Sequence, residues 1–144
     1  MFSVGLSEMV LPVKNVKSAA QFYQEIVGLT PDPAASSWEG VGQGWAWFWA
    51  GDPGKRQRVA LLERSLANKR FAIKGVANVP EDRQWGQIHF AFEIPRDRID
   101  RAVVHVRSAG VAVEGPIRLE WMKANAYYFY DLDGNLLEWW SPDR

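Results

Sequence analysis

The sequence predicts an α+β protein in which one unit, a strand, a helix and three further strands, is present twice. The first observation is a repeated tripeptide, Leu-Leu-Glu, which ends at Glu63 and again at Glu138. The second is the spacing: Glu63 follows Glu8 by 55 residues, and Glu138 follows His89 by 49. Each interval opens on a predicted strand and closes on another. A symmetric pairing of the units would bring these four side chains to one place.

The first unit opens with a strand over residues 7–13. Asn15 is then placed to cap a helix, and Gly28 is a natural stop at its end. The apolar stripe of this helix is Val16, Ala19, Ala20, Tyr23, Ile26 and Val27. Trp45, Trp47 and Trp49 alternate with smaller residues, which indicates a strand with both faces at least partly covered. A turn at residues 52–54 leads to a strand over residues 58–63.

The second unit repeats this order, with a strand over residues 87–94 that Pro95 ends. Asp97 is expected to cap the next helix, with Asp100 in its first turn, and Gly110 ends it. The buried stripe of that helix is Ile99, Ala102, Val103 and Val106. Residues 111–113, 126–130 and 135–140 are predicted strands. The Asp133-Gly134 pair between the last two favours a tight hairpin over a calcium loop.

We expect one compact domain with three parts: residues 1–64, a crossover over residues 65–84, and residues 85–144. The crossover is mixed and basic, and residues 71–73 are a candidate short strand within it. Lys69, Arg70 and Lys74 are most simply solvated side chains, and an anion-binding role for them is the weaker alternative.

Composition excludes several classes of partner. The chain has 144 residues, with 17 basic and 17 acidic side chains, so no net field would gather nucleic acid or an anionic membrane. It has no cysteine, and therefore no disulfide, thiolate metal site or cysteine nucleophile. No signal peptide or apolar run long enough to cross a bilayer is evident. We expect a cytoplasmic protein with a small-molecule substrate.

Two sets of motifs carry a family resemblance. The first unit has Val-Lys-Asn-Val-Lys-Ser at residues 13–18, then Phe22-Tyr23 and the Val-Gly-Leu of residues 27–29. The second has Asp-Leu-Asp-Gly-Asn at residues 131–135, followed by Glu138. Over nearly its whole length the chain resembles the vicinal oxygen chelate superfamily, which includes glyoxalase I, extradiol dioxygenases and bleomycin-binding proteins. The motifs are specific for the fold and much less so for a reaction.

The resemblance implies two βαβββ modules whose curved mixed sheets surround a central cavity. It also implies a metal site with ligands at the start of the first strand and near the end of the last strand of each module. These places fall on Glu8, Glu63, His89 and Glu138. By resemblance to glyoxalase I, Glu138 is the first candidate for a catalytic base and Glu63 the second. Many members dimerise, so a homodimer is expected.

A charge argument bears on the same four residues. Alone, His89 is more often a hydrogen-bonded core histidine, and Glu63 and Glu138 could be carboxylates in water. Three carboxylates about 4 Å apart, however, repel pairwise by about 4 kcal/mol at an effective dielectric of 20, so a cluster must bind a cation or protons. If the fold brings them together, their oxygens with one imidazole suit Mn, Fe, Ni, Co, Mg or Zn. If the strands diverge, this argument no longer applies.

Aromatic residues supply candidate walls for a substrate pocket. The chain has eight tryptophans, whose simplest role is core packing or a dimer interface. The residues predicted to contact substrate are Trp45, Trp47, Trp49, Tyr127, Phe129 and Trp140. In the other strand register, Tyr128 and Tyr130 would replace Tyr127 and Phe129.

Three functions remain open. The first is a divalent-metal-dependent, glyoxalase-like lyase or isomerase that moves a proton next to a carbonyl of a small oxygenated substrate. The second is a metal-free protein that sequesters an aromatic compound, as bleomycin-resistance proteins do. The number of tryptophans favours it, and so does Glu8, which stands where the resemblance implies histidine or glutamine as the first metal ligand. The third is an extradiol-type dioxygenase, which usually requires two histidines and one carboxylate, whereas only His89 stands at a matched place.

Overall fold

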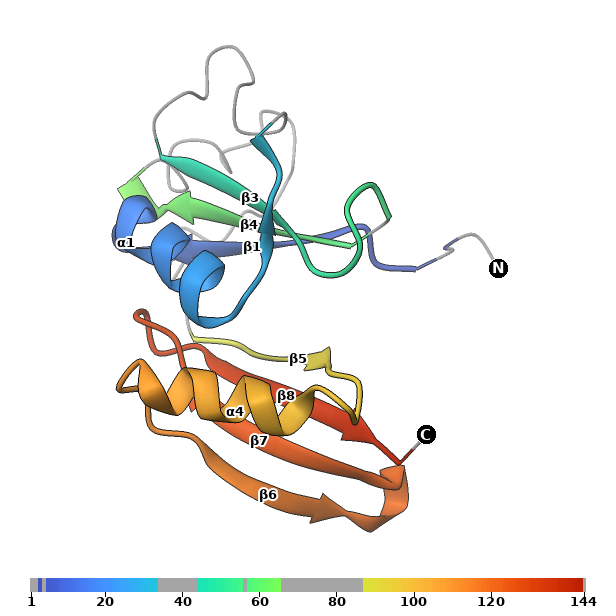
Figure 1. The fold of residues 1–144 in the computed structure, drawn as a ribbon. Helices are drawn as coiled ribbons and strands as arrows, with labels where there is room; N and C mark the ends of the chain where they lie inside the picture. Colours follow the sequence, from blue (N-terminus) through green and yellow to red (C-terminus); the bar gives the residue numbers. More distant parts are fainter. Residues whose placement is uncertain (1–2, 4, 34–43, 56, 66–86, 144) are drawn as a thin grey trace. The chain divides into compact units, whose positions relative to one another are not determined.

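The computed structural model describes residues 3, 5–33, 44–55, 57–65 and 87–143. The chain divides into two compact units, Met1–Gly86 and Gln87–Arg144, which we call unit 1 and unit 2. Each unit contains one four-stranded mixed sheet and one principal helical segment (Figure 1). The predicted crossover over residues 65–84, with Lys69, Arg70, Lys74 and the candidate strand 71–73, lies outside the described residues except for residue 65.

Unit 1 contains β1 (Glu8–Val13), β2 (Thr30–Pro31), β3 (Trp45–Trp49) and β4 (Arg58–Glu63). The sheet order is β1-β4-β3-β2. The first strand is parallel to the last, with Glu8 opposite Arg58 and Val13 opposite Glu63. The other two pairings are antiparallel. The predicted strands are therefore present, and β2 is an additional short edge strand.

The helical segment of unit 1 consists of α1 (Val16–Gln21) and the π-helical turn η1 (Phe22–Ile26). The side chain of Asn15 accepts a hydrogen bond from the backbone N–H of Ser18 at 3.0 Å, as an N-cap does. The expected single α-helix becomes a wider π turn after Gln21, where Val27 N–H bonds to the carbonyl of Phe22. Gly28 then takes a φ of 83°, which ends the segment.

Unit 2 contains β5 (His89–Glu93), α4 (Ile99–Ser108), β6 (Glu114–Leu119), the 3₁₀ turn η2 (Glu120–Met122), β7 (Ala124–Tyr130) and β8 (Leu136–Pro142). Its sheet order is β5-β8-β7-β6, again with the first strand parallel to the last. The predicted fold class, α+β with two repeated βαβββ modules and mixed sheets, is confirmed.

Two predicted boundaries in unit 2 were wrong. The second strand of the unit, β6, begins at Glu114, because the apolar run 111–113 only leads into it. Pro116 and Arg118 interrupt the alternating strand pattern of the residues that follow. The N-cap of α4 is Arg98 and makes no side-chain capping bond, so Asp97 does not cap this helix.

The β7–β8 hairpin confirms the turn interpretation of residues 131–135. The buried carboxylate of Asp131 accepts hydrogen bonds from the backbone N–H of Asp133 at 2.9 Å and of Asn135 at 2.8 Å. Asn135 in turn accepts a bond from the backbone N–H of Ile88, just before β5. Asp131 therefore stabilises the turn and its attachment to the sheet through a local Asx-type pattern.

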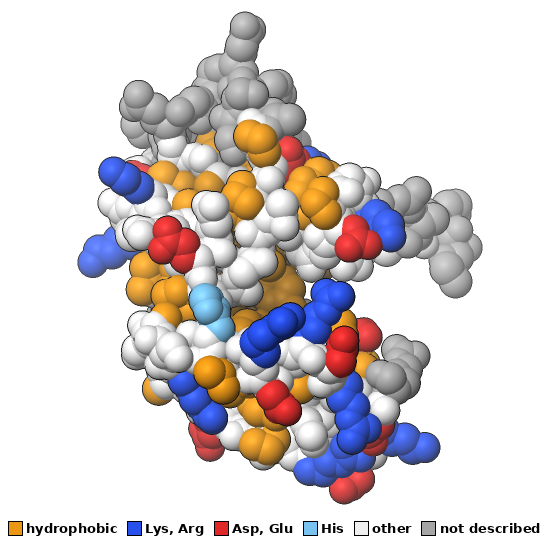
Figure 2. Space-filling view, in the orientation of Figure 1, with side chains coloured by type: hydrophobic (Ala, Val, Ile, Leu, Met, Phe, Trp, Pro, Cys, Tyr) orange, Lys and Arg blue, Asp and Glu red, His pale blue; other side chains and the backbone are white. Residues whose placement is uncertain are grey.

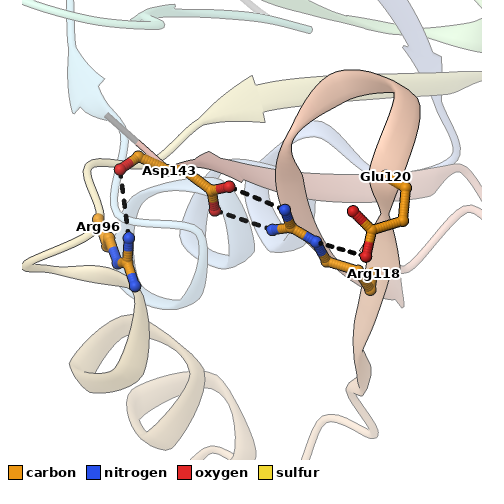
Figure 3. Close-up of polar contacts among 4 residues, drawn as sticks. All are labelled: Arg96, Arg118, Glu120 and Asp143. Atoms are coloured by element: carbon orange, nitrogen blue, oxygen red, sulfur yellow. Dashed lines mark hydrogen bonds and ion pairs between the residues drawn. The ribbon is translucent and has the colours of Figure 1, made fainter.

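The C-terminal residues of unit 2 are held by an arginine network (Figure 3). Arg118 on β6 donates two parallel hydrogen bonds, both of 2.8 Å, to the carboxylate of Asp143. Its Nε lies 3.3 Å from Glu120, and Arg96 donates to the backbone carbonyl of Asp143 at 3.2 Å. This bidentate geometry joins the end of β8 to the edge strand β6.

Each sheet has a helix-covered face that forms the core of its unit. In unit 1, Tyr23 of η1 lies 6.5 Å from Phe48 of β3, ring centre to ring centre. In unit 2, the rings of Phe129 and Trp139 pack edge to face with their centres 5.0 Å apart. These side chains are at most 2% exposed. We call the opposite side of each sheet its helix-free face.

The surface and the helices bear on possible partners. On the face drawn in Figure 2, acidic and basic side chains of the described residues are interspersed, in line with the zero net charge. No helix within the described residues is long and apolar enough to cross a membrane.

Candidate functional site

The helix-free faces carry most of the predicted site residues, because side chains alternate along each strand. In unit 2 the face includes His89 of β5, Tyr128 of β7, and Glu138 and Trp140 of β8. In unit 1 it includes Glu8, Arg58 and the three tryptophans of β3.

In unit 2, His89 and Glu138 are in direct contact. The Nε2 atom of the imidazole lies 3.0 Å from Oε2 of the carboxylate. Parallel pairing puts His89 opposite Leu136, so Glu138 is two residues further along β8 on the same face. The Glu138 side chain is 11% exposed and the His89 side chain 50% exposed, so solvent reaches this pair from the imidazole side.

Tyr128 completes this cluster, and sequence reasoning named it only as the alternative register. It lies directly opposite Glu138 on β7, and its ring centre is 5.9 Å from that of His89. The pKa of the Tyr128 hydroxyl is raised, first by burial and then by the negative charge of Glu138. The hydroxyl therefore stays protonated beside the carboxylate, as a hydrogen-bond donor.

In unit 1 the counterpart of His89 is Glu8, which faces an arginine. Its carboxylate lies 4.0 Å from the guanidinium of Arg58, and Asp32 lies 3.6 Å from the same group. The residue two positions beyond Arg58 on β4 is Ala60, so Ala60 occupies the place that Glu138 has in unit 2. Unit 1 therefore does not repeat the contact between imidazole and carboxylate.

The tryptophans of β3 form a row on this face. Trp45 and Trp47 are stacked, with ring centres 5.8 Å apart and planes inclined by 11°. The guanidinium of Arg58 lies over the rings of Trp47 and Trp49, at 4.8 and 5.5 Å from their centres. This is cation–π geometry. The sequence analysis missed Arg58, because only the register of β3 on β4 places it beside Trp49.

Glu63 lies apart from these groups. It is five residues beyond Arg58 on β4, an odd number, so it belongs to the helix-covered face of unit 1. Its carboxylate accepts a hydrogen bond of 3.4 Å from the backbone N–H of Val16, the first residue of α1. A carboxylate there stabilises the helix N-terminus. Along the strand it is about 16 Å from the level of Glu8.

The aromatic residues of β7 also divide between the two faces. Tyr127 and Phe129, the predicted substrate contacts, lie on the helix-covered face, where Tyr127 pairs with Trp139 and both are buried. Tyr128 and Tyr130, the alternative set, lie on the helix-free face with Trp140. A bulge in β6 between Glu114 and Ile117 leaves this parity of β7 unchanged.

The predicted ligand set fits a metal only in part. A catalytic metal centre typically uses about three protein ligands. In octahedral coordination two neighbouring donors, each about 2.1 Å from the ion, bind at right angles and lie about 3 Å apart. The separation of His89 Nε2 and Glu138 Oε2 matches this value. Glu63, however, accepts a hydrogen bond from the N-terminus of α1, and Glu8 lies near the guanidinium of Arg58. Among the described residues, no cluster of three histidine or acidic side chains is present.

The comparisons with known proteins agree with this fold. The chain belongs to the Glyoxalase/Bleomycin resistance protein/Dioxygenase superfamily, whose profile it matches over residues 5–139. The resemblance inferred from the sequence is therefore confirmed. No curated protein sequence matches the chain.

Several solved structures are similar over almost their full length. An integron cassette protein from the mobile metagenome of the Halifax Harbour sewage outfall is 30% identical, with a TM-score of 0.68 and coverage of 96% of this chain and 99% of that one. An antibiotic-binding protein from a Streptomyces species is 22% identical, with a TM-score of 0.68 and 99% coverage of both chains. Lactoylglutathione lyase from Agrobacterium tumefaciens is 21% identical, with a TM-score of 0.70 and coverage of 98% and 96%. At these identities the last two show the fold alone.

Proposed function

We propose that this protein binds and sequesters a flat aromatic small molecule, and that the tryptophan row of unit 1 supplies the recognition surface. The observation that supports this most is the parallel stack of Trp45 and Trp47 on a face that carries no helix. All three tryptophans of the row keep partial exposure. Ring faces presented in this way suit another planar ring, which gains about 0.5–1.5 kcal/mol per aromatic pair beyond the area buried.

Arg58 supports the same function. Its guanidinium lies across the rings of Trp47 and Trp49, and two carboxylates lie nearby, Asp32 at 3.6 Å and Glu8 at 4.0 Å. These contacts hold the guanidinium over the ring faces and limit the motion of the indoles. A surface ordered before binding loses less conformational entropy when the ligand arrives.

The absence of an acidic counterpart in unit 1 favours binding over metal chemistry. Where unit 2 has Glu138, the described residues of unit 1 have Ala60, and Glu63 caps α1. The predicted set of four ligands would have needed a second donor from unit 1 beside Glu8, and neither Ala60 nor Glu63 supplies one on this face. The superfamily name includes bleomycin resistance, and one similar fold is an antibiotic-binding protein, so ligand binding is in keeping with the family.

Titration of tryptophan fluorescence tests this function. The purified protein is titrated with a panel of planar polycyclic aromatic compounds, with aliphatic compounds of equal size as controls. We expect quenching and saturable binding for one or more aromatic compounds, and loss of at least about tenfold in affinity in Trp47→Ala.

Trp121→Ala is the matched control, because Trp121 is 83% exposed and lies in unit 2. It should leave affinity unchanged. Equal losses in the two variants, or no saturable binding across the panel, would contradict the proposal. Thermal unfolding of each variant separates lost binding from lost folding.

A second candidate function is a metal-dependent, glyoxalase-like lyase or isomerase, which the contact of His89 with Glu138 favours. When bound, a divalent metal would polarise a substrate oxygen, and His89 and Glu138 are the residues placed to hold it. Glu8 stays a predicted further ligand. The buried carboxylate of Glu138 lies beside a protonated Tyr128 hydroxyl, so these two groups could exchange a proton with a bound substrate.

Elemental analysis tests the second candidate. Protein purified without a chelating column, after growth with added transition metals, should then carry about one metal per chain. His89→Ala and Glu138→Ala should both lose the metal, whereas Glu63→Ala should keep it, because Glu63 lies on the other face of its sheet. Metal-free protein under these conditions would exclude this candidate. The homodimer and the cytoplasmic location stay predictions.

A further inference from the structure

Unit 2 contains a pocket at one end of its sheet. Its volume is about 520 Å³, within the usual range for small-molecule sites. Its walls come from the residues after α4, the start of β6, the end of β7 and the start of β8. All the lining residues belong to unit 2, and none is a tryptophan of the row in unit 1.

The pocket has aromatic walls on its helix-free side. Tyr128 and Tyr130 alternate along β7 and both line it, and Tyr130 is 63% exposed. Leu136 lies directly opposite Tyr130, and Glu114 directly opposite Tyr128. The pocket lining therefore includes two phenol rings and one carboxylate, and its other residues are apolar: Ala112, Val113, Phe129 and Leu136.

One carboxylate belongs to the pocket lining, and a second lies opposite one of the lining tyrosines. Glu114 is the charged side chain in the lining, and within the described part of the chain it makes no ion pair or side-chain hydrogen bond. Glu138 lies directly opposite Tyr128, on β8, and its carboxylate is 3.0 Å from the imidazole of His89. The guanidinium of Arg107 on α4 donates hydrogen bonds to the backbone carbonyls of Val113 at 3.0 Å and Gly115 at 3.4 Å.

We propose that this pocket binds a small organic cation, a protonated amine carried on an apolar or aromatic body. Tyrosine ring faces attract cations, and an unpaired carboxylate at the rim adds a direct ion-pairing partner. The apolar body would lie against Leu136 and the Tyr130 ring. This inference does not depend on the function proposed for unit 1, because it rests on other residues in another unit.

Three probes of nearly equal shape test the charge requirement: phenethylamine, phenethyl alcohol and phenylacetate. Isothermal titration at neutral pH should give the order amine, alcohol, acid, with the amine at least about fivefold tighter than the alcohol. Equal binding of amine and alcohol, tighter binding of phenylacetate, or no binding of the amine at millimolar concentration would overturn the proposal.

Substitutions of lining residues test whether the amine binds in this pocket. Glu114→Gln and Tyr130→Ala change exposed side chains and should each weaken amine binding at least about threefold, with little effect on the alcohol. Glu93→Gln is the control, because Glu93 is exposed on the helix-free face of the same sheet but does not line the pocket. If Glu93→Gln weakens binding as much as Glu114→Gln does, the attraction is general surface charge and the proposal fails. Trp47→Ala should leave amine binding unchanged, which separates this site from the tryptophan row.

Discussion

The two units share one strand order, yet their helix-free faces have different chemistry. In unit 2, His89 meets Glu138 at 3.0 Å, and Tyr128 lies beside them. In unit 1 the corresponding places hold Glu8 and Ala60, and an arginine lies over two tryptophans. The two units therefore have the same strand pairing but different side chains at corresponding places on their sheets. A function inferred for one unit does not apply to the other.

The strongest test of this comparison is to give unit 1 the carboxylate that unit 2 has at the corresponding position, by the substitution Ala60→Glu. Ala60 is 0% exposed, so Ala60→Glu would place a carboxylate in a buried position, where the guanidinium of Arg58 already has two carboxylates nearby. We expect the free energy of unfolding to fall by about 3 kcal/mol or more, measured by urea denaturation. Ala60→Ser, a small polar control, should cost much less. A stable Ala60→Glu variant would show that this face tolerates the unit 2 chemistry.

A second test removes the side chain at the start of the first strand in each unit, which is His89 in unit 2 and Glu8 in unit 1. His89→Ala deprives a largely buried carboxylate of a partner and should lower the free energy of unfolding by about 1.5–3 kcal/mol. Glu8→Ala removes a carboxylate that is 39% exposed and 4.0 Å from Arg58, so the expected change is below about 1 kcal/mol. Chemical denaturation of both variants measures the contrast. Equal costs would mean that the two positions are energetically equivalent.

A third test compares the helix N-termini. Asn15→Ala removes the side-chain cap of α1 and should cost about 1 kcal/mol. Arg98 makes no capping bond on α4, so Arg98→Ala should be nearly neutral, and Arg98→Asp should stabilise the helix by a few tenths to about 1 kcal/mol. Thermal unfolding followed by circular dichroism measures all three. A gain from Arg98→Ala as large as that from Arg98→Asp would rule out the capping explanation.

The smallest expected effect concerns pH and the end of unit 2. The hydrogen bond from Arg118 lowers the pKa of Asp143 below its usual value. A lowered pKa in the folded state means that the stabilisation is complete above the usual pKa of about 4 and is lost as the pH falls through the lower value. Hydrogen exchange near residues 118 and 143 should therefore increase in acid. Asp143→Asn should show that exchange already at neutral pH, and an unchanged acid profile in this variant would contradict the assignment.

Local sequence signals predicted most of the elements of the fold. Asn15 and Gly28 correctly marked the limits of the first helical segment, and Asp131 to Asn135 marked the last hairpin. These signals act between neighbours in the chain, so they do not require knowledge of the tertiary structure. The strand β6 was placed too early because Pro116 and a bulge interrupt its alternation.

The candidate site could be predicted only in part, because it depends on strand register. The repeated Leu-Leu-Glu aligned Glu63 with Glu138, whereas the register makes Ala60 the counterpart of Glu138. A shift of three residues along a strand also reverses the face, which is why Glu63 reaches the N-terminus of α1. The same parity put Tyr128, and not Tyr127, beside Glu138.

The class of fold and the order of the elements could be predicted from local patterns in the sequence, whereas the metal-ligand role of His89 and Glu138 stays a prediction. Periodicity, caps and turn residues carry that information over short distances along the chain. Three features depend on the folded structure: Glu63 bonds to the N-terminus of α1, Arg58 lies over two tryptophans, and Tyr128 lines the pocket. Those outcomes follow from lateral pairing between strands far apart in the chain, where a shift of one residue moves a side chain to the other face.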